Sequence, residues 1–161
     1  MLEHPLMPES TKIDPHPFRF KSGSTVVYPD GKPFVIRRTD TNQSALILNE
    51  IDRDTESQAK FKDKLKAWGT IWQSGAYKKY GHKGALLRIV TTSDYHMGKL
   101  MEWTADILGK PTYAIFGRVF DHTVLGSKSP VNFDQLTQLY QRVGHPPLSL
   151  VTLSIAQKEA A

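Results

Sequence analysis

The strongest constraint on the fold is a short apolar run that leads directly into acidic residues and then into a helical pattern. The run covers residues 45–48, and continuous apolar character over so few residues is typical of a strand covered on both faces. Side chains alternate along a strand, so Glu50 and Asp52 are expected on the same side of the sheet. Two carboxylates placed together repel unless a cation, a proton or a basic group lies between them. The segment therefore predicts a buried strand that ends in an acidic site.

The rest of the chain alternates strand and helix patterns around this segment. Further strands are expected at about 25–28, 34–38, 86–92 and 112–120, the first two forming a hairpin through an Asp-Gly turn at 30–31. Helices are expected at about 55–75, 94–108 and 132–143, each with a capping residue at its start and a glycine at its end. The order β-β-β-α-β-α-β-α predicts an α/β fold, with a mixed central sheet of about five strands and helices on both faces.

The length and the composition indicate one domain without a membrane segment. A chain of 161 residues is long enough for one core, which we expect at 23–147, after an extended or poorly ordered proline-containing arm at 1–22 and before a tail of uncertain structure at 148–161. No apolar run approaches the ~20 residues needed to cross a bilayer, and the start does not resemble a secretory signal. A cytoplasmic location is the resulting expectation. Because the chain has no cysteine, any metal must have oxygen or imidazole ligands.

The chain is basic, with a formal net charge of +5 and a pI of about 9.4. Lysine and arginine neutralise phosphates and release counterions, so such a balance favours polyanionic partners. A solvated basic surface that binds no nucleic acid explains the same charge. The choice between these interpretations depends on whether a site is present.

The acids suggest a metal site. Asp30, in the turn that follows a predicted strand, is expected to meet Glu50 and Asp52 at one edge of the sheet. Carboxylate oxygens suit Mg²⁺ or Mn²⁺, and such an ion can hold a phosphodiester and activate water for its hydrolysis. In the alternative interpretation, Asp30 serves only the turn and the other two acids pair with Arg37, Arg38 or Arg53.

Two short motifs carry a resemblance to a known family. The sequence Tyr-Pro-Asp-Gly at 28–31 is followed, after about twenty residues, by Glu-Ile-Asp-Arg-Asp-Thr-Glu at 50–56 and then by a helix with Lys-Leu. Over residues 26–92 this arrangement resembles the replication-relaxation family of plasmids and other mobile elements. The C-terminal domain of that family is similar to the PD-(D/E)XK restriction-endonuclease superfamily. Its members usually carry an N-terminal winged helix, for which we expect no room here.

The resemblance implies a DNA-binding nuclease-like domain, with Asp30 and Glu50 as the acids of the superfamily motif. Where the superfamily has lysine, this chain has Asp52, which either adds a metal ligand or prevents cleavage. Lys64, or Lys60, on the following helix can supply the missing ammonium. The catalytic set expected is thus Asp30, Glu50, Asp52 and Lys64, and the first three are the expected metal ligands. The alternative is a DNA-binding or protein-interaction module that keeps the fold without cleaving DNA.

A second candidate for DNA contact is the basic aromatic stretch at 77–83. Lysines there can contact phosphates and tyrosines can stack on bases, although positive charge is also favoured at any helix end. The residues expected to contact nucleic acid are Arg37, Arg38, Lys60, Tyr77, Lys78, Lys79 and Lys83. Replication or mobile-element proteins are the other partners that the resemblance implies.

Other classes of site have little support in the sequence. Ser93, Asp94 and His96 lie close together, but a helix cap explains them better than a catalytic triad. The histidines lack the paired spacing of a metal motif and are expected mostly at the surface. The glycines form neither a phosphate-binding loop nor a dinucleotide fingerprint, so nucleotide hydrolysis and hydride transfer are not indicated.

Overall fold

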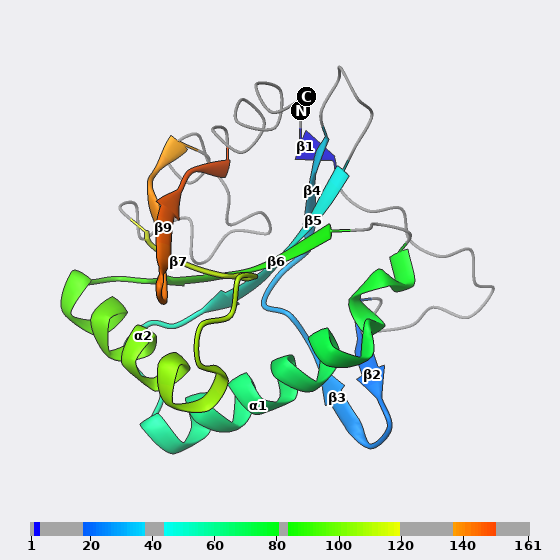
Figure 1. The fold of residues 1–161 in the computed structure, drawn as a ribbon, viewed down its shortest axis with the longest axis horizontal. Coiled ribbons are helices and arrows are strands. Elements are labelled where there is room, and N and C mark those ends of the chain that lie inside the picture. Colours follow the sequence, from blue (N-terminus) through cyan, green and yellow to red (C-terminus); the bar gives the residue numbers. More distant parts are fainter. Residues whose placement is uncertain (1, 4–17, 38–43, 81–83, 120–136, 151–161) are drawn as a thin grey trace.

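The computed structural model describes residues 2–3, 18–37, 44–80, 84–119 and 137–150, which form one large sheet, two long helices and a small hairpin (Figure 1). The elements in chain order are β1 (Leu2–Glu3), β2 (Phe20–Ser22), β3 (Thr25–Val27), β4 (Phe34–Arg37), β5 (Ser44–Ile51), α1 (Gln58–Ser74), the 3₁₀ helix η1 (Ala76–Tyr80), β6 (Gly84–Thr91), α2 (Asp94–Leu108), β7 (Ala114–Arg118), β8 (Tyr140–Arg142) and β9 (His145–Leu148).

The main sheet is mixed and runs in the order β1-β4-β5-β6-β7-β8-β9. Its central strands β5, β6 and β7 are parallel, joined by crossovers through α1 and α2, whereas β4 and β8 are antiparallel to their neighbours. The prediction of an α/β fold with a mixed sheet is confirmed. Among the residues that the structure describes, no helix is both long and apolar enough to cross a membrane.

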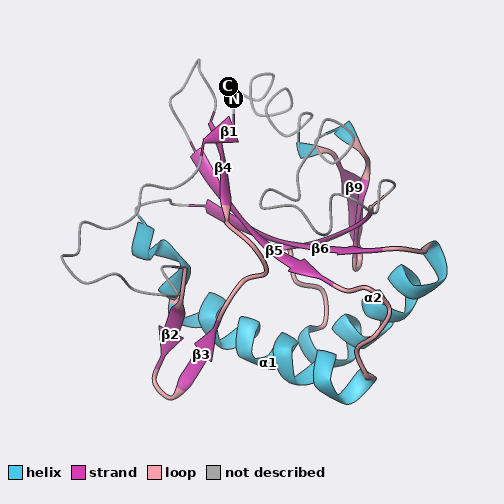
Figure 2. Ribbon diagram, turned by 180° about the vertical axis from the view of Figure 1, so that it is seen from behind, coloured by secondary structure: helices cyan, strands magenta, loops and turns pink. Residues whose placement is uncertain are grey.

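Both long helices cover the same face of the sheet, as Figure 2 shows. Leu46 and Leu48 of β5 point to this face and pack with Leu65 of α1 and Leu100 of α2. The alternate residue Ile47 points to the opposite face, where it belongs to a second apolar cluster that includes residues of the C-terminal segment 140–150. The prediction of helices on both faces is therefore wrong for the described part of the chain, because the segment that includes β8 and β9 covers the second face.

The predicted hairpin of residues 25–28 and 34–38 is also wrong. β3 pairs with β2 in a separate two-stranded sheet, whereas β4 pairs with β1 and β5. Pro29 and Pro33 flank the Asp-Gly turn and lack the amide hydrogen that a strand ladder needs. The segment between them instead carries the chain from one sheet to the other.

The third predicted helix, at 132–143, is wrong beyond Thr137, the one described residue of that segment that is helical. Tyr140–Arg142 is strand β8, and Gly144, with a φ of 69°, lies in the turn that leads into β9. Residues 132–136 lie outside the described residues. Tyr140 is buried on the second face of the sheet, so packing against β6 and β7 overrides the helical spacing of apolar residues in this segment.

The other two predicted helices are confirmed; α1 starts three residues later than predicted, and α2 has the predicted limits. Ser57, rather than Thr55, caps α1, since its Oγ accepts a 3.3 Å hydrogen bond from the amide of Lys60. Ser93 caps α2 in the same way through the amide of His96, at 3.1 Å, which supports the cap interpretation of that serine. The described core also reaches beyond the expected limits of 23 and 147, because Phe20 and Leu150 are buried.

Candidate active site

The candidate site is built around Glu50, the penultimate residue of β5. Glu50 follows Leu46 and Leu48 in the alternation of the strand, so its side chain points toward the helices and is only 5% exposed. Two residues of α1 hold its carboxylate. The indole Nε1 of Trp68 donates a 2.7 Å hydrogen bond to Oε1, and Nζ of Lys64 lies 3.3 Å from Oε2. A buried acid is thus fixed through both of its oxygens.

Asp30 is held beside the end of β5 by two backbone hydrogen bonds. Its amide donates to the carbonyl oxygen of Asn49 at 2.8 Å, and its Oδ2 accepts from the amide of Ile51, also at 2.8 Å. These bonds bring the Asp30 carboxylate within hydrogen-bonding reach of Glu50. Burial, followed by the charge of Asp30, raises the pKa of Glu50 to about 8, although Lys64 and Trp68 act in the opposite direction. This pKa favours the protonated form of Glu50 at neutral pH.

Lys64 reaches the acids from the second turn of α1. Its ammonium forms ion pairs with Glu50 and with Glu56, at 2.6 Å from Oε1 of the latter. Burial lowers the pKa of Lys64, but the charge of Glu50 and the hydrogen bond to Glu56 outweigh it and hold that pKa above its ordinary value. Lys64 therefore places a positive charge beside Glu50, as the sequence predicts.

Asp52 also points toward the helices but contacts a different partner. Its Oδ2 lies 3.0 Å from Nε2 of His96 on α2, and its Oδ1 accepts a 2.8 Å hydrogen bond from the amide of Asp54. The second ring nitrogen of His96 lies 2.8 Å from Oδ1 of Asp54, a residue with a φ of 63°. His96 is buried, whereas the histidines were expected mostly at the surface. The structure thus brings Asp30, Glu50 and Lys64 together, while Asp52 joins an acid–histidine–acid group.

The pair of Asp30 and Glu50 fits a hard divalent cation. The described residues contain no group of three or more histidine and acidic side chains placed to hold a metal. Mg²⁺, however, is commonly bound through one or two carboxylates, with water and substrate phosphates completing its shell. Two acids within hydrogen-bonding reach of each other form a place where a cation can replace the proton that Glu50 binds. The residues present therefore suit Mg²⁺ or Mn²⁺ as an exchangeable ion.

The residues expected to contact nucleic acid are spread over other parts of the molecule. Lys60 is exposed on α1, 4.0 Å from Glu56, and Arg37 is exposed at the end of β4. Arg38 and Lys83 lie outside the described residues.

The described part of the basic aromatic stretch forms η1, beyond the C-terminal end of α1. Tyr77 stacks on Trp72 at 5.2 Å between ring centroids, and Lys78 lies 5.8 Å from the Tyr77 ring. Lys79 donates a 2.8 Å hydrogen bond to the carbonyl oxygen of Arg19. Ten residues of helix separate Lys64 from the end of α1 at Ser74, or about 15 Å at 1.5 Å per residue. These contacts give the stretch a packing role at a distance from the acids.

Sequence reasoning missed three residues of the site. Trp68 and Glu56 were not among the expected site residues, and the histidines, including His96, were expected mostly at the surface. The spacing of Lys64 and Trp68, four residues apart on one helix, is a signal that could have placed both next to a strand end. No local pattern links His96 to Asp52, since 44 residues separate them.

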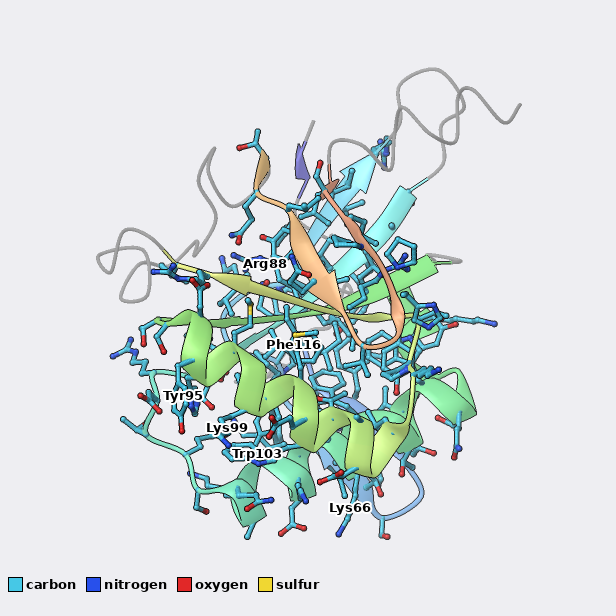
Figure 3. All side chains as sticks on the ribbon, turned by 60° about the vertical axis from the view of Figure 1, so that its left-hand side comes forward. Lys66, Arg88, Tyr95, Lys99, Trp103 and Phe116 are labelled. Atoms are coloured by element: carbon cyan, nitrogen blue, oxygen red, sulfur yellow. The ribbon has the colours of Figure 1, made fainter. Side chains whose placement is uncertain are left out.

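Polar contacts also fix the opposite face of β5. Arg88 of β6 is completely buried, and its guanidinium donates to Oδ1 of Asn49 and to the hydroxyl of Tyr140, both at 2.8 Å. Figure 3 shows Arg88 on the side of the sheet away from α2, whereas Phe116 faces that helix. Asn49 directly precedes Glu50, so the site strand is held on both of its faces.

Comparison with known proteins gives no match to a family model, to a curated protein or to a solved structure.

Proposed function

We propose that this chain is a nuclease-like DNA-binding domain that hydrolyses phosphodiester bonds with a divalent ion held by Asp30 and Glu50. The observation that carries the proposal is the convergence of these two carboxylates with the ammonium of Lys64 at the end of β5. We further propose that the fold is restriction-endonuclease-like and that the protein acts in the cytoplasm, in replication or maintenance of a plasmid or other mobile element. The resemblance of residues 26–92 to the replication-relaxation family supports that context.

Each residue of the proposed site has a separate role in the reaction. Asp30 and Glu50 would hold Mg²⁺ or Mn²⁺, which when bound polarises the phosphoryl oxygen and lowers the pKa of water. Lys64 stays protonated because of its acidic neighbours, so it can stabilise negative charge that develops on the phosphate. Trp68 fixes the orientation of the Glu50 carboxylate. In the superfamily motif the lysine stands at the position of Asp52, whereas here the ammonium comes from Lys64 on α1. This supports a role for Asp52 that differs from that of the superfamily lysine.

A second candidate function is DNA binding or protein interaction without cleavage. The observation that favours it is the engagement of Asp52 by His96 and Asp54, which leaves no basic group at the position where the superfamily motif has lysine. In this case the basic balance of the chain would support salt-dependent DNA binding, since each phosphate contact releases counterions. The ion site would then be vestigial.

Metal titration combined with cleavage assays tests both candidates. Binding of Mg²⁺ and Mn²⁺ is measured by calorimetry on the wild-type chain and on Asp30→Asn and Glu50→Gln, which keep the shapes of the side chains. The matched control is Asp63→Asn, because Asp63 is an exposed acid on α1 whose side chain is 78% accessible. Supercoiled, linear and single-stranded DNA serve as substrates.

We expect both site variants to lose metal binding and cleavage by tenfold or more, and Asp63→Asn to behave as wild type. DNA binding without cleavage under any metal condition would favour the second candidate. The nuclease proposal is wrong if neither ion binds or supports cleavage and Glu50→Gln changes only the free energy of unfolding.

A further inference from the structure

Two exposed tyrosines lie close in sequence to residues in and beside the candidate active site. Among the described residues, the large apolar side chains with high exposure are Val26, Tyr28, Tyr95 and Leu139, of which Tyr28 and Tyr95 are aromatic. Tyr28 precedes Asp30 by two residues, and Tyr95 directly precedes His96. Both exposed aromatic rings thus belong to the segments that carry the acidic groups.

Tyr95 is the more exposed of the two, at 77%, in the first turn of α2. Nζ of Lys99, one helical turn later, lies 5.7 Å from the centroid of its ring. Figure 3 shows Tyr95, Lys99 and Trp103 following one another along α2. Exposing so much of an aromatic ring forgoes the stabilisation that its burial would give, and the adjacent ammonium makes the surface suitable for an anionic aromatic ligand.

This part of α2 is anchored to the end of the site strand. His96 contacts Asp52, and Asp52 follows Glu50 by two residues, or about 7 Å along an extended chain. A polymer bound with one phosphate at Glu50 can therefore extend toward the first turn of α2, which carries Tyr95. In DNA the next unit of the polymer is a nucleotide, which offers a phosphate to Lys99 and a base to Tyr95.

The exposed ring faces distinguish between forms of DNA. In a duplex, the faces of the bases are covered by their neighbours, so a tyrosine can stack only on a base that is unpaired and unstacked. We infer that the preferred substrate of the site is single-stranded DNA, with Tyr95 stacking on a base next to the scissile phosphate and Lys99 pairing with a backbone phosphate. Tyr28 forms a second stacking position beside Asp30. The inference rests on the proposed function and specifies its substrate class.

Anisotropy of a labelled oligonucleotide tests the inference without requiring cleavage. The same sequence is offered in single-stranded and duplex form to the whole chain, with Ca²⁺ in place of Mg²⁺ to suppress hydrolysis. The variants are Tyr95→Ala, Tyr95→Phe and Tyr28→Ala. Leu139→Ala is the control, because Leu139 is also an exposed apolar side chain, at 60%, and lies next to β8.

The lysine has its own matched control. Lys99 and Lys66 are helical lysines that each pair with an acid three residues away, Glu102 and Asp63 respectively, with side chains 40% and 63% exposed. Lys66 lies on α1, away from Tyr95, as Figure 3 shows. Lys99→Gln is therefore compared with Lys66→Gln, and each is measured over a range of salt concentrations.

We expect the single strand to bind more tightly than the duplex, and Tyr95→Ala to weaken single-strand binding by about tenfold, in the range typical for loss of one stacked base. Tyr95→Phe should retain binding, since the ring face is preserved. Lys99→Gln should reduce the salt dependence and Lys66→Gln should not.

Tighter duplex binding, together with a Tyr95→Ala effect no larger than that of Leu139→Ala, overturns the inference while leaving the proposed function intact. If Tyr95→Phe weakens binding as much as Tyr95→Ala, the contact is made by the hydroxyl and not by the ring face. That result also overturns the inference. No binding of either form of DNA, at any metal or salt condition, refutes the proposed function and the inference together.

Discussion

The indole nitrogen of Trp68 donates a 2.7 Å hydrogen bond to the carboxylate of Glu50, and both residues are almost completely buried. This bond joins the centre of α1 to the end of β5, so a core aromatic residue also orients the acid on which the proposed chemistry depends. A substitution that removes the indole N–H of Trp68 but keeps an aromatic ring separates its role in the core from its role in orienting Glu50.

Trp68→Phe should lower the free energy of unfolding by about 2–4 kcal/mol, because a buried acid loses its donor and the smaller ring leaves a cavity. Trp72→Phe is the control. Trp72 is a half-buried tryptophan on the same helix that stacks on Tyr113 at 4.3 Å, and its loss should cost about 1 kcal/mol. Urea unfolding of both variants measures the difference. Equal losses would show that the bond to Glu50 adds nothing to packing.

The pKa of Glu50 predicts how the free energy of unfolding depends on pH. The ordinary value is 4.5 and the folded value is about 8, so the folded protein binds a proton that the unfolded chain releases between these values. The contribution of Glu50 to the free energy of unfolding is therefore greatest at low pH. It falls as pH rises from about 4.5 to about 8, by up to about 1.4 kcal/mol per pH unit.

Glu50→Gln mimics the protonated acid and should remove this part of the pH dependence, leaving the variant more stable than wild type near pH 8. Urea unfolding at several pH values across the window measures the two slopes. Asp63→Asn, which alters an exposed acid, should keep the wild-type slope. A Glu50→Gln variant with an unchanged slope would mean that Glu50 is already ionised in the folded protein at neutral pH.

Lys64→Gln tests the ammonium that lies between Glu50 and Glu56. Without it the two acids repel each other, so the pKa of Glu50 should rise further and the chain should be less stable above neutral pH. Under the proposed function, cleavage should fall by a hundredfold or so while DNA binding is largely kept, since the lysine acts mainly on developing charge. Single-turnover cleavage and anisotropy separate the two effects.

Lys62→Gln is the matched control for that variant. Lys62 also lies on α1 and forms a 3.0 Å ion pair, with Asp106 of α2, but it is not part of the acidic site. Its replacement should leave cleavage unchanged. If the two variants cleave equally well, Lys64 has only a structural role.

His96→Ala should be among the more destabilising changes, because it leaves the buried carboxylate of Asp52 without its imidazole partner. Breaking a buried polar pair on one side costs about 3 kcal/mol. His145→Ala is the control, since His145 is only half-buried and its Nε2 lies 3.0 Å from a backbone oxygen, that of Lys110, instead of from a buried carboxylate. Thermal unfolding compares the two. A His96→Ala variant as stable as His145→Ala would show that Asp52 is solvated in solution.

Local periodicity was sufficient to predict the central part of the fold. The apolar run before Glu50, the next strand at 84–91 and helices α1 and α2 were predicted because burial imposes a period of two on strands and 3.6 on helices. The proximity of Asp30, Glu50 and Lys64 followed from the motifs. The strands and helices among these features depend on residues near one another in the chain.

The errors lie where distant segments decide the structure. β3 pairs with β2 because Phe20 and Val27 join the core beneath α1, a contact that no turn motif reveals. Tyr140 has helical spacing with its neighbours, yet its burial against the sheet makes the segment a strand. Asp52 was expected to lie with Asp30 and Glu50, but its carboxylate contacts His96, which is distant in sequence. Propensity is a weak guide where such tertiary contacts compete.

The bonds of Arg88 to Asn49 and Tyr140 have a consequence for shortened forms of the protein. A premature stop codon or a proteolytic cut upstream of Tyr140 would remove β8 and leave the guanidinium of Arg88 facing solvent across an uncovered sheet. The strand that carries Glu50 would lose support on that face, even though every acid of the site would still be encoded. Truncated products of this gene should therefore be less stable and shorter-lived than the full chain, even with every acid of the site present.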